Sequence, residues 1–194
     1  YYLVEHLGMA VQITGLDLKE DVVTFCSETA RKLGFKQLEF VCADIRDFRS
    51  EGKVDLVVSL HACDTATDFA LTQAVKWGAE VILAVPCCQH EVSAQLETGV
   101  QPVLLQHGIM KERAASLLTD AARGKLLETK GYSVQIMEFI DLEHTPKNLL
   151  IRALRGGCAD REQARREYMA FKEYWGIKPT LERLLEDVPA DPTA

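Results

Sequence analysis

Two short apolar runs, residues 54–60 (VDLVVSL) and residues 80–85 (EVILAV), decide the fold class of this chain. Each run is nearly continuous in apolar residues, as is expected of a strand that is buried on both faces of a sheet. A helical stretch at 67–77 lies between them and ends at Gly78, and Pro86 ends the second run. Strand, helix and strand in this order predict a parallel unit of an α/β sheet.

The same alternation continues on both sides of this unit. Strands are predicted at 11–18, 38–45, 54–60, 80–85, 132–140 and 148–154, and the longest helices at 20–33 and 111–130. The last two strands follow one another without a helix between them, and we expect 148–154 to run antiparallel between 80–85 and 132–140. The fold class is therefore α/β, a doubly wound and mostly parallel sheet with a reversed final strand, which is typical of the Rossmann-like methyltransferase sheet.

Length and composition narrow the class of protein further. With 194 residues, of which 47% are hydrophobic, the chain is long enough for one domain and too short for two ordinary ones. We expect a core over 1–155 and a helical extension over 156–194 that packs on it. The net charge of −7 argues against a protein that binds nucleic acid unaided, and no apolar run is long enough to cross a membrane. Six cysteines without the spacing of a secreted framework favour the cytoplasm.

Acidic residues end the first two predicted strands, at the sheet edge where α/β proteins bind their ligands. Asp17 is placed to accept two hydrogen bonds from the ribose hydroxyls of a nucleoside, or else to cap the helix that follows. Asp44 is placed to accept a hydrogen bond from an adenine amine, with Ile45 beside the ring, or else to form a turn. The expected nucleoside site is completed by three further residues at strand ends: Leu18, Ser59 and Leu60.

Two longer motifs carry a resemblance to a known family. Residues 59–68 (SLHACDTATD) and 85–91 (VPCCQHE) resemble the paired signatures of a family of bacterial S-adenosylmethionine (SAM)-dependent methyltransferases. That family is distantly similar to the tRNA acceptor-stem 2′-O-methyltransferases and to the methyltransferase domain of glutathione-S-transferase-C-terminal-domain proteins. The likeness continues to the tail at 175–185 and so covers nearly the whole chain. It implies SAM as the cofactor and methyl transfer as the reaction.

The resemblance does not extend to the N-terminal part of the family's domain. The family begins this domain with a strand and an Asp/Gly-rich turn that cradles the methionine part of SAM, whereas Gly8 and Gly15 are isolated here and no Gly-x-Gly occurs. We therefore expect the first strand and the glycine-rich loop to be absent from this chain. A segment before Tyr1 or a second chain is expected to supply them, unless 11–18 pairs directly with 54–60.

Cysteine and histidine residues gather after the strands at 54–60 and 80–85, and three interpretations of them stay open. As a methyl-acceptor pocket, His61 or Asp64 would act as a general base and the loops would position the acceptor. As a metal site, the thiolate and imidazole ligands would suit Zn²⁺, although their spacing is not that of a zinc finger. As inert residues, the cysteines would be small buried hydrophobes, since adjacent ones rarely point the same way from a strand. We adopt the first interpretation, assign no metal ligand, and place eight residues around the acceptor: His61, Asp64, Cys87, Cys88, Gln89, His90, Lys147 and Asn148.

The sequence thus predicts a cytoplasmic SAM-dependent methyltransferase, with RNA modification as the leading activity through the resemblance alone. A non-catalytic Rossmann-like module that binds RNA or a partner protein is the alternative. An NAD(P)-linked enzyme is disfavoured by the reversed final strand and the two motifs. Away from the site, Asp120 and Arg123 are spaced i, i+3 on a predicted helix and are expected to pair with little effect on stability.

Overall fold

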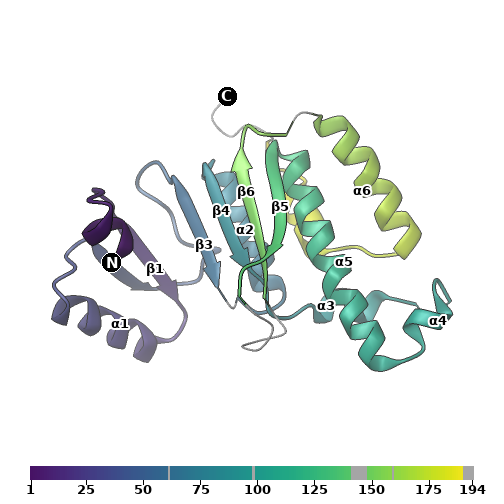
Figure 1. Cartoon of the computed structure of the whole chain (residues 1–194), viewed down its shortest axis with the longest axis horizontal. Helices are drawn as coiled ribbons and strands as arrows, with labels where there is room; N and C mark the ends of the chain where they lie inside the picture. Colours follow the sequence, from purple (N-terminus) through teal and green to yellow (C-terminus); the bar gives the residue numbers. More distant parts are fainter. Residues whose placement is uncertain (61, 98, 141–147, 159, 190–194) are drawn as a thin grey trace. The chain divides into compact units, whose positions relative to one another are not determined.

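The computed structural model describes residues 1–60, 62–97, 99–140, 148–158 and 160–189 (Figure 1). These residues form two compact units, which divide between Arg49 and Ser50. Among them, the first unit contains a sheet of two strands and the second a sheet of four. The boundary expected between a core and an extension at residue 155 stays a prediction.

In the first unit, one helix connects a pair of parallel strands. A π-helical turn, η1 (Tyr2–His6), is followed by β1 (Ile13–Asp17), α1 (Glu20–Lys32) and β2 (Leu38–Cys42). β1 and β2 pair in parallel along their whole length, with Asp17 opposite Cys42 at the end. The two upstream strands expected from the sequence are therefore confirmed. Because the two strands are parallel, Asp17 and Asp44 both lie at the edge of this small sheet where the strands end.

Gly15 of β1 is required by side-chain packing across this pair. A Cβ atom at this position would lie 2.6 Å from the ring of Phe40 on β2. Such an approach is a steric clash, so a side chain at Gly15 would displace the ring. This glycine, which belongs to no glycine-rich motif, therefore has a structural role.

The second unit contains the sheet with the reversed strand. Its elements include β3 (Leu56–Leu60), α2 (Thr65–Lys76), β4 (Val81–Val85), β5 (Tyr132–Glu138) and β6 (Leu149–Arg155). The strand order is β3-β4-β6-β5, with β3 and β4 parallel and β6 antiparallel to both of its neighbours (Figure 1). The predicted position and direction of the final strand are confirmed. The direct pairing of 11–18 with 54–60 is not formed among the described strands, since β1 pairs with β2 and β3 with β4.

The described part of the second unit has five further helices: α3 (His90–Gln95), α4 (Pro102–Leu105), α5 (Gly108–Thr129), α6 (Arg161–Trp175) and α7 (Thr180–Leu185). Helices α5 and α6 lie side by side, where Lys125 and Glu167 form an ion pair at 2.8 Å. Asp160 caps the start of α6, where its side chain accepts a hydrogen bond from the backbone N–H of Gln163, and Gly176 caps its end. Within the described ranges, no helix is both long and apolar enough to cross a membrane.

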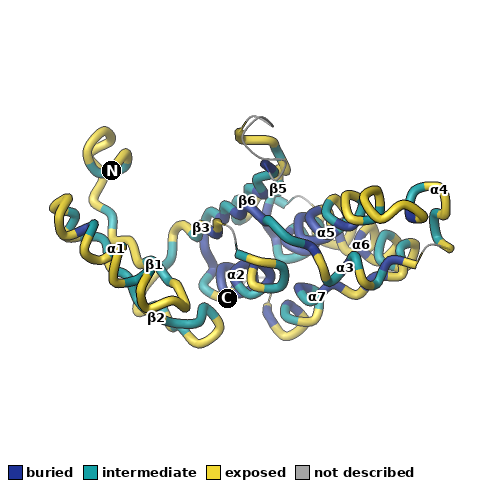
Figure 2. Tube along the Cα trace, turned by 90° about the horizontal axis from the view of Figure 1, so that it is seen from below, coloured by how far each residue is buried: buried dark blue, intermediate teal, exposed yellow. Residues whose placement is uncertain are grey.

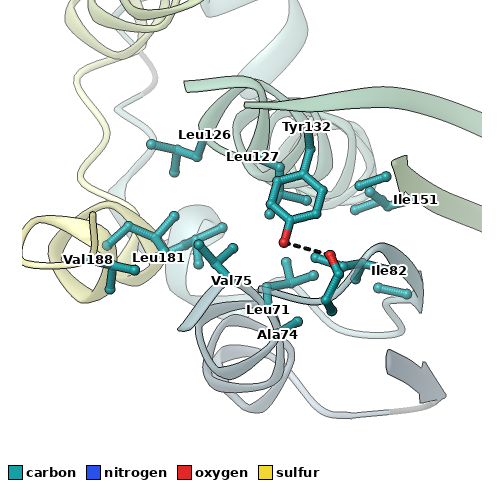
Figure 3. Close-up of a cluster of buried hydrophobic side chains, with 14 of the residues drawn as sticks. Leu71, Ala74, Val75, Ile82, Leu126, Leu127, Tyr132, Ile151, Leu181 and Val188 are labelled. Atoms are coloured by element: carbon teal, nitrogen blue, oxygen red, sulfur yellow. Dashed lines mark hydrogen bonds between the residues drawn. The ribbon is translucent and has the colours of Figure 1, made fainter. Parts of the chain in front are cut away.

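The main core of this unit lies between the sheet and helices α2, α5 and α7 (Figure 3). Leu71 and Val75 of α2, Ile82 of β4, Leu127 of α5 and Ile151 of β6 are fully buried there. Figure 2 shows the contrast between α2, which is mostly buried, and α6, which is mostly exposed. A smaller cluster under α3 and α4 extends the core along α5. Helices from the early and the late parts of the unit's sequence thus pack against the same face of the sheet.

β3 differs from the expectation that it is buried on both faces. Ser59 is 9% exposed, but Leu56, Val58 and Leu60 are 43%, 52% and 61% exposed. Alternate residues of a strand point to opposite faces, so this strand has one buried and one exposed face. The continuous apolar run predicted the strand correctly. The prediction that both faces of this strand are buried is wrong.

Tyr132 at the start of β5 joins the sheet to the turn after α2. Its side chain is buried among the leucines of the main core, and its hydroxyl donates a hydrogen bond to the carbonyl oxygen of Ala79 at 2.9 Å (Figure 3). Burial raises the pKa of this phenol to about 12.

Replacing Tyr132 by phenylalanine keeps the ring and leaves the buried Ala79 carbonyl unpaired. We expect the free energy of unfolding to fall by about 1–2 kcal/mol near pH 7. Above the ordinary tyrosine pKa of about 10, the unfolded chain loses this proton before the native protein does, so the parent loses stability as the pH rises through about 12. Between about pH 9 and about pH 11, urea unfolding should show the parent losing about 1 kcal/mol more than Tyr132→Phe. Equal losses in the two proteins would show that Tyr132 titrates normally in the native state.

Candidate functional site

Three cysteine thiols meet where β3 and β4 end. Cys63 follows β3, and Cys87 and Cys88 follow β4. Their three Sγ atoms all lie within 4.8 Å of one another, and the Cys87 and Cys88 sulfurs are 3.7 Å apart. All three are free thiols; Cys63 is exposed and the other two are partly buried. The convergence at strand ends that the sequence predicted is therefore present for these residues.

The adjacent cysteines point the same way because they are not part of a strand. β4 ends at Val85, and Pro86 separates its last residue from Cys87. Proline has no N–H to continue the ladder, so the backbone leaves the strand and the alternation of side chains ends there. The argument for inert cysteines, which assumed strand geometry, does not apply at this point of the chain.

The protonation of Cys63 depends on the other two thiols. A hydrogen bond with Cys88 and the negative charge of Asp64 raise the pKa of Cys63, whereas a hydrogen bond with Cys87 opposes this effect. A nucleophilic cysteine is normally activated by a lowered pKa. Cys63 therefore lacks the signature of an activated nucleophile.

The loop that carries Cys63 is held by its neighbours. Thr67 donates a hydrogen bond to the Ala62 carbonyl at 2.7 Å, and Arg123 donates one to the Asp64 carbonyl at 2.8 Å. Asp64 has φ +48° and ψ −117°, and in the described part of the chain it is the one non-glycine residue with positive φ. Such a conformation is costly and persists where surrounding contacts enforce it. The contacts to Ala62 and Asp64 supply that enforcement.

Arg123 is the centre of a buried ionic network behind this loop. Its Nε lies 2.7 Å from Asp68 Oδ1 on α2, and its Nη1 lies 3.0 Å from Asp120 Oδ1 on α5. The three side chains are 1–3% exposed. Gln89, in the loop after β4, donates to Asp120 Oδ2 at 3.2 Å. The network thus joins α2, α5 and both loops that carry the cysteines.

In this network, burial favours the neutral form of each group, and the attraction between opposite charges favours the charged form. Burial raises the pKa of Asp68, and the nearby guanidinium opposes this effect. Burial alone would lower the pKa of Arg123, but the carboxylates of Asp68 and Asp120 outweigh it and raise that pKa. Arg123 is therefore a permanent buried cation. The predicted pairing of Asp120 with Arg123 is confirmed. Only a small effect of this pair on stability was expected, but that expectation assumed an exposed pair, and this pair is buried.

Several predicted acceptor-site residues make hydrogen bonds within the structure. Gln89 is 6% exposed and bonded to Asp120. Asn148 is 2% exposed and donates to the Ile140 carbonyl at 2.9 Å. Asp64 accepts from the backbone N–H of Glu91 at 3.4 Å, and His90 is exposed at the start of α3. The acceptor roles of these residues stay predictions, as do those of His61 and Lys147, which lie outside the described residues.

The first unit carries the predicted nucleoside-binding residues at the ends of β1 and β2. Asp17 is exposed and its Oδ1 accepts from the backbone N–H of Lys19 at 2.8 Å. Arg46 Nε lies 3.0 Å and 2.9 Å from the two carboxylate oxygens of Asp44, and this contact lowers the pKa of Asp44. Both carboxylates thus take part in local turns. Their roles, and those of Leu18, Ile45, Ser59 and Leu60, stay predictions.

Asp68 and the importance of Arg123 were missed from the sequence. The available signal was the small residues Ala115, Thr119 and Ala122, which recur at helical spacing beside Arg123 and are buried in α5. A helix face of small residues permits close packing, so an arginine beside it had to be paired with an acid. The charge of Arg123, taken alone, suggested that its side chain is exposed.

Comparison with known proteins relates the first part of this chain to methyl transfer. Residues 1–95 match the model of a methyltransferase domain. Glutathione S-transferase C-terminal domain-containing proteins from Homo sapiens and Macaca fascicularis are each 25% identical over 173 residues, covering 75% of this chain and 26% of theirs. The chain spans about a quarter of the length of these curated relatives. The domain match extends through α3 and so includes both cysteine loops.

Replacing Arg123 by methionine keeps much of the side-chain length and leaves two buried carboxylates without their cation. We expect the free energy of unfolding, measured by urea denaturation, to fall by about 3–5 kcal/mol. Arg113→Met, at an exposed position of the same helix, is the matched control and should change it by less than about 0.5 kcal/mol. Adding Asp68→Asn and Asp120→Asn should recover part of the loss, because no charge then stays buried. A loss no larger than that of the control would contradict the role given to Arg123.

Proposed function

We propose that this protein is a SAM-dependent methyltransferase. The match of residues 1–95 to a methyltransferase domain carries the proposal. The β3-β4-β6-β5 order with β6 reversed supports it, because the sequence expectation of a methyltransferase-type sheet required this arrangement. SAM supplies an activated methyl group, and the protein's part is to bind it and to align an acceptor with it.

In this proposal Asp17 is the main contact of the nucleoside half of SAM. Asp17 is exposed at the end of β1, and its bond to Lys19 fixes the direction of its carboxylate. A carboxylate can accept from both ribose hydroxyls at once. Asp44 is the weaker contact, because an adenine amine would have to compete with Arg46 for it.

Asp64 and His61 are the proposed bases for the methyl acceptor. An acceptor that is an un-ionised hydroxyl must lose its proton as the new bond to carbon forms. Asp64, or His61 near it in sequence, takes that proton. Thr67 holds the Ala62 carbonyl and Arg123 holds the Asp64 carbonyl, so residues 62–64 are held in place before the acceptor arrives. RNA is the proposed acceptor class, and this part rests on the sequence resemblance to tRNA methyltransferases.

Calorimetric titration of the full-length protein with SAM and with its demethylated product tests the proposal. Both should bind, and Asp17→Asn should weaken binding roughly 10- to 100-fold, since a charged hydrogen bond contributes about 1.5–3 kcal/mol. Asparagine keeps an oxygen for the Lys19 N–H, so the turn is preserved. Asp21→Asn, in the first turn of α1, is the control and should bind like the parent. Absence of binding by the parent would instead favour a non-catalytic binding module, and unchanged binding by Asp17→Asn would remove Asp17 from the site.

A further inference from the structure

The cluster of Cys63, Cys87 and Cys88 has the dimensions of a metal-binding site. Two sulfurs that each lie about 2.3 Å from a tetrahedral Zn²⁺ are about 3.8 Å apart. The Cys87 and Cys88 sulfurs are already 3.7 Å apart, and no pair in the cluster exceeds 4.8 Å. Cys63 is exposed, so a small rotation about its side-chain bond can complete the approach.

We propose that Cys63, Cys87 and Cys88 bind Zn²⁺ through three thiolates, with water in the fourth coordination position. Thiolates are soft ligands, and they bind Zn²⁺ in preference to hard cations such as Mg²⁺ and Ca²⁺. Each thiol releases its proton when the cation binds. Among the described residues this group consists of the three cysteines alone, and three protein ligands with one open position are typical of catalytic rather than structural zinc sites.

The surrounding structure holds the ligands in place before a cation binds. The Ala62 carbonyl accepts from Thr67 at 2.7 Å and lies 3.9 Å from the Cys87 sulfur, so it connects the two cysteine loops. Arg123 holds Asp64, the residue after Cys63, and Asp120 holds Gln89, the residue after Cys88. Because both loops are fixed to the same buried network, less conformational entropy is lost on binding. The Asp64 carboxylate also adds negative charge beside Cys63, which favours a cation.

Two other interpretations of the cluster fit less well. A zinc finger needs a second ligand pair at a set spacing, which the sequence lacks. An activated nucleophile needs positive charge beside it, whereas Cys63 has two other thiols and Asp64 as neighbours. A cation satisfies all three thiols together.

Titration with Co²⁺ tests this site without reference to methyl transfer. The reduced, chelator-treated protein should bind one equivalent of Co²⁺, giving thiolate-to-cobalt charge-transfer absorption and the visible bands of tetrahedral cobalt. One equivalent of Zn²⁺ should abolish these bands. Cys63→Ser should weaken Co²⁺ binding roughly a hundredfold and lower the charge-transfer intensity, because one of three thiolates is lost.

Cys158→Ser is the matched control, because Cys158 belongs to the same unit and is a free thiol outside the cluster. It should bind Co²⁺ like the parent, and circular dichroism should show that both variants fold. Cys88→Ser provides a second cluster variant with the same expected loss. Absence of the thiolate bands, unchanged binding by Cys63→Ser, or an equal loss in Cys158→Ser would overturn the proposal.

Discussion

The buried ionic network around Arg123 is the constraint on which the arrangement of the second unit depends. One guanidinium contacts Asp68 on α2, Asp120 on α5 and the carbonyl of Asp64. Removing these charges from water is costly, and each partner makes the burial of the others tolerable. The helices and the loop therefore have to keep one relative arrangement, because any shift would leave a buried charge without its partner.

The geometry of the cysteine loops follows from this constraint. Asp64 is held through its carbonyl and keeps an unusual backbone conformation, while Gln89 is held through Asp120. Cys63 and Cys88 are the residues directly before these two anchors. Their thiols meet because the anchors fix both loops, and not because the strands alone would direct them together. The network thus links helix packing to the place where the three cysteine thiols converge.

The sequence predicted the topology better than the environment of single residues. The reversed strand β6 was predictable, because two strands without a helix between them must run in opposite directions when they are neighbours. The shared direction of Cys87 and Cys88 was not, because it depends on where β4 ends. The burial of Arg123 depends on Asp68, 55 residues away in the chain, and local spacing shows only Asp120. The exposed face of β3 was missed because an apolar run does not reveal what covers it.

The most direct measurement of the central claim is the transfer of a labelled methyl group. The full-length protein is incubated with methyl-labelled SAM and a heat-inactivated cell extract, beside a control without the protein, and the products are divided and treated with ribonuclease or with protease. We predict that label enters macromolecular material only when the protein is present. Ribonuclease should release this label and protease should not. Label that only protease releases would make protein the acceptor in place of RNA. No incorporation in any fraction would contradict the assignment of this protein as a methyltransferase.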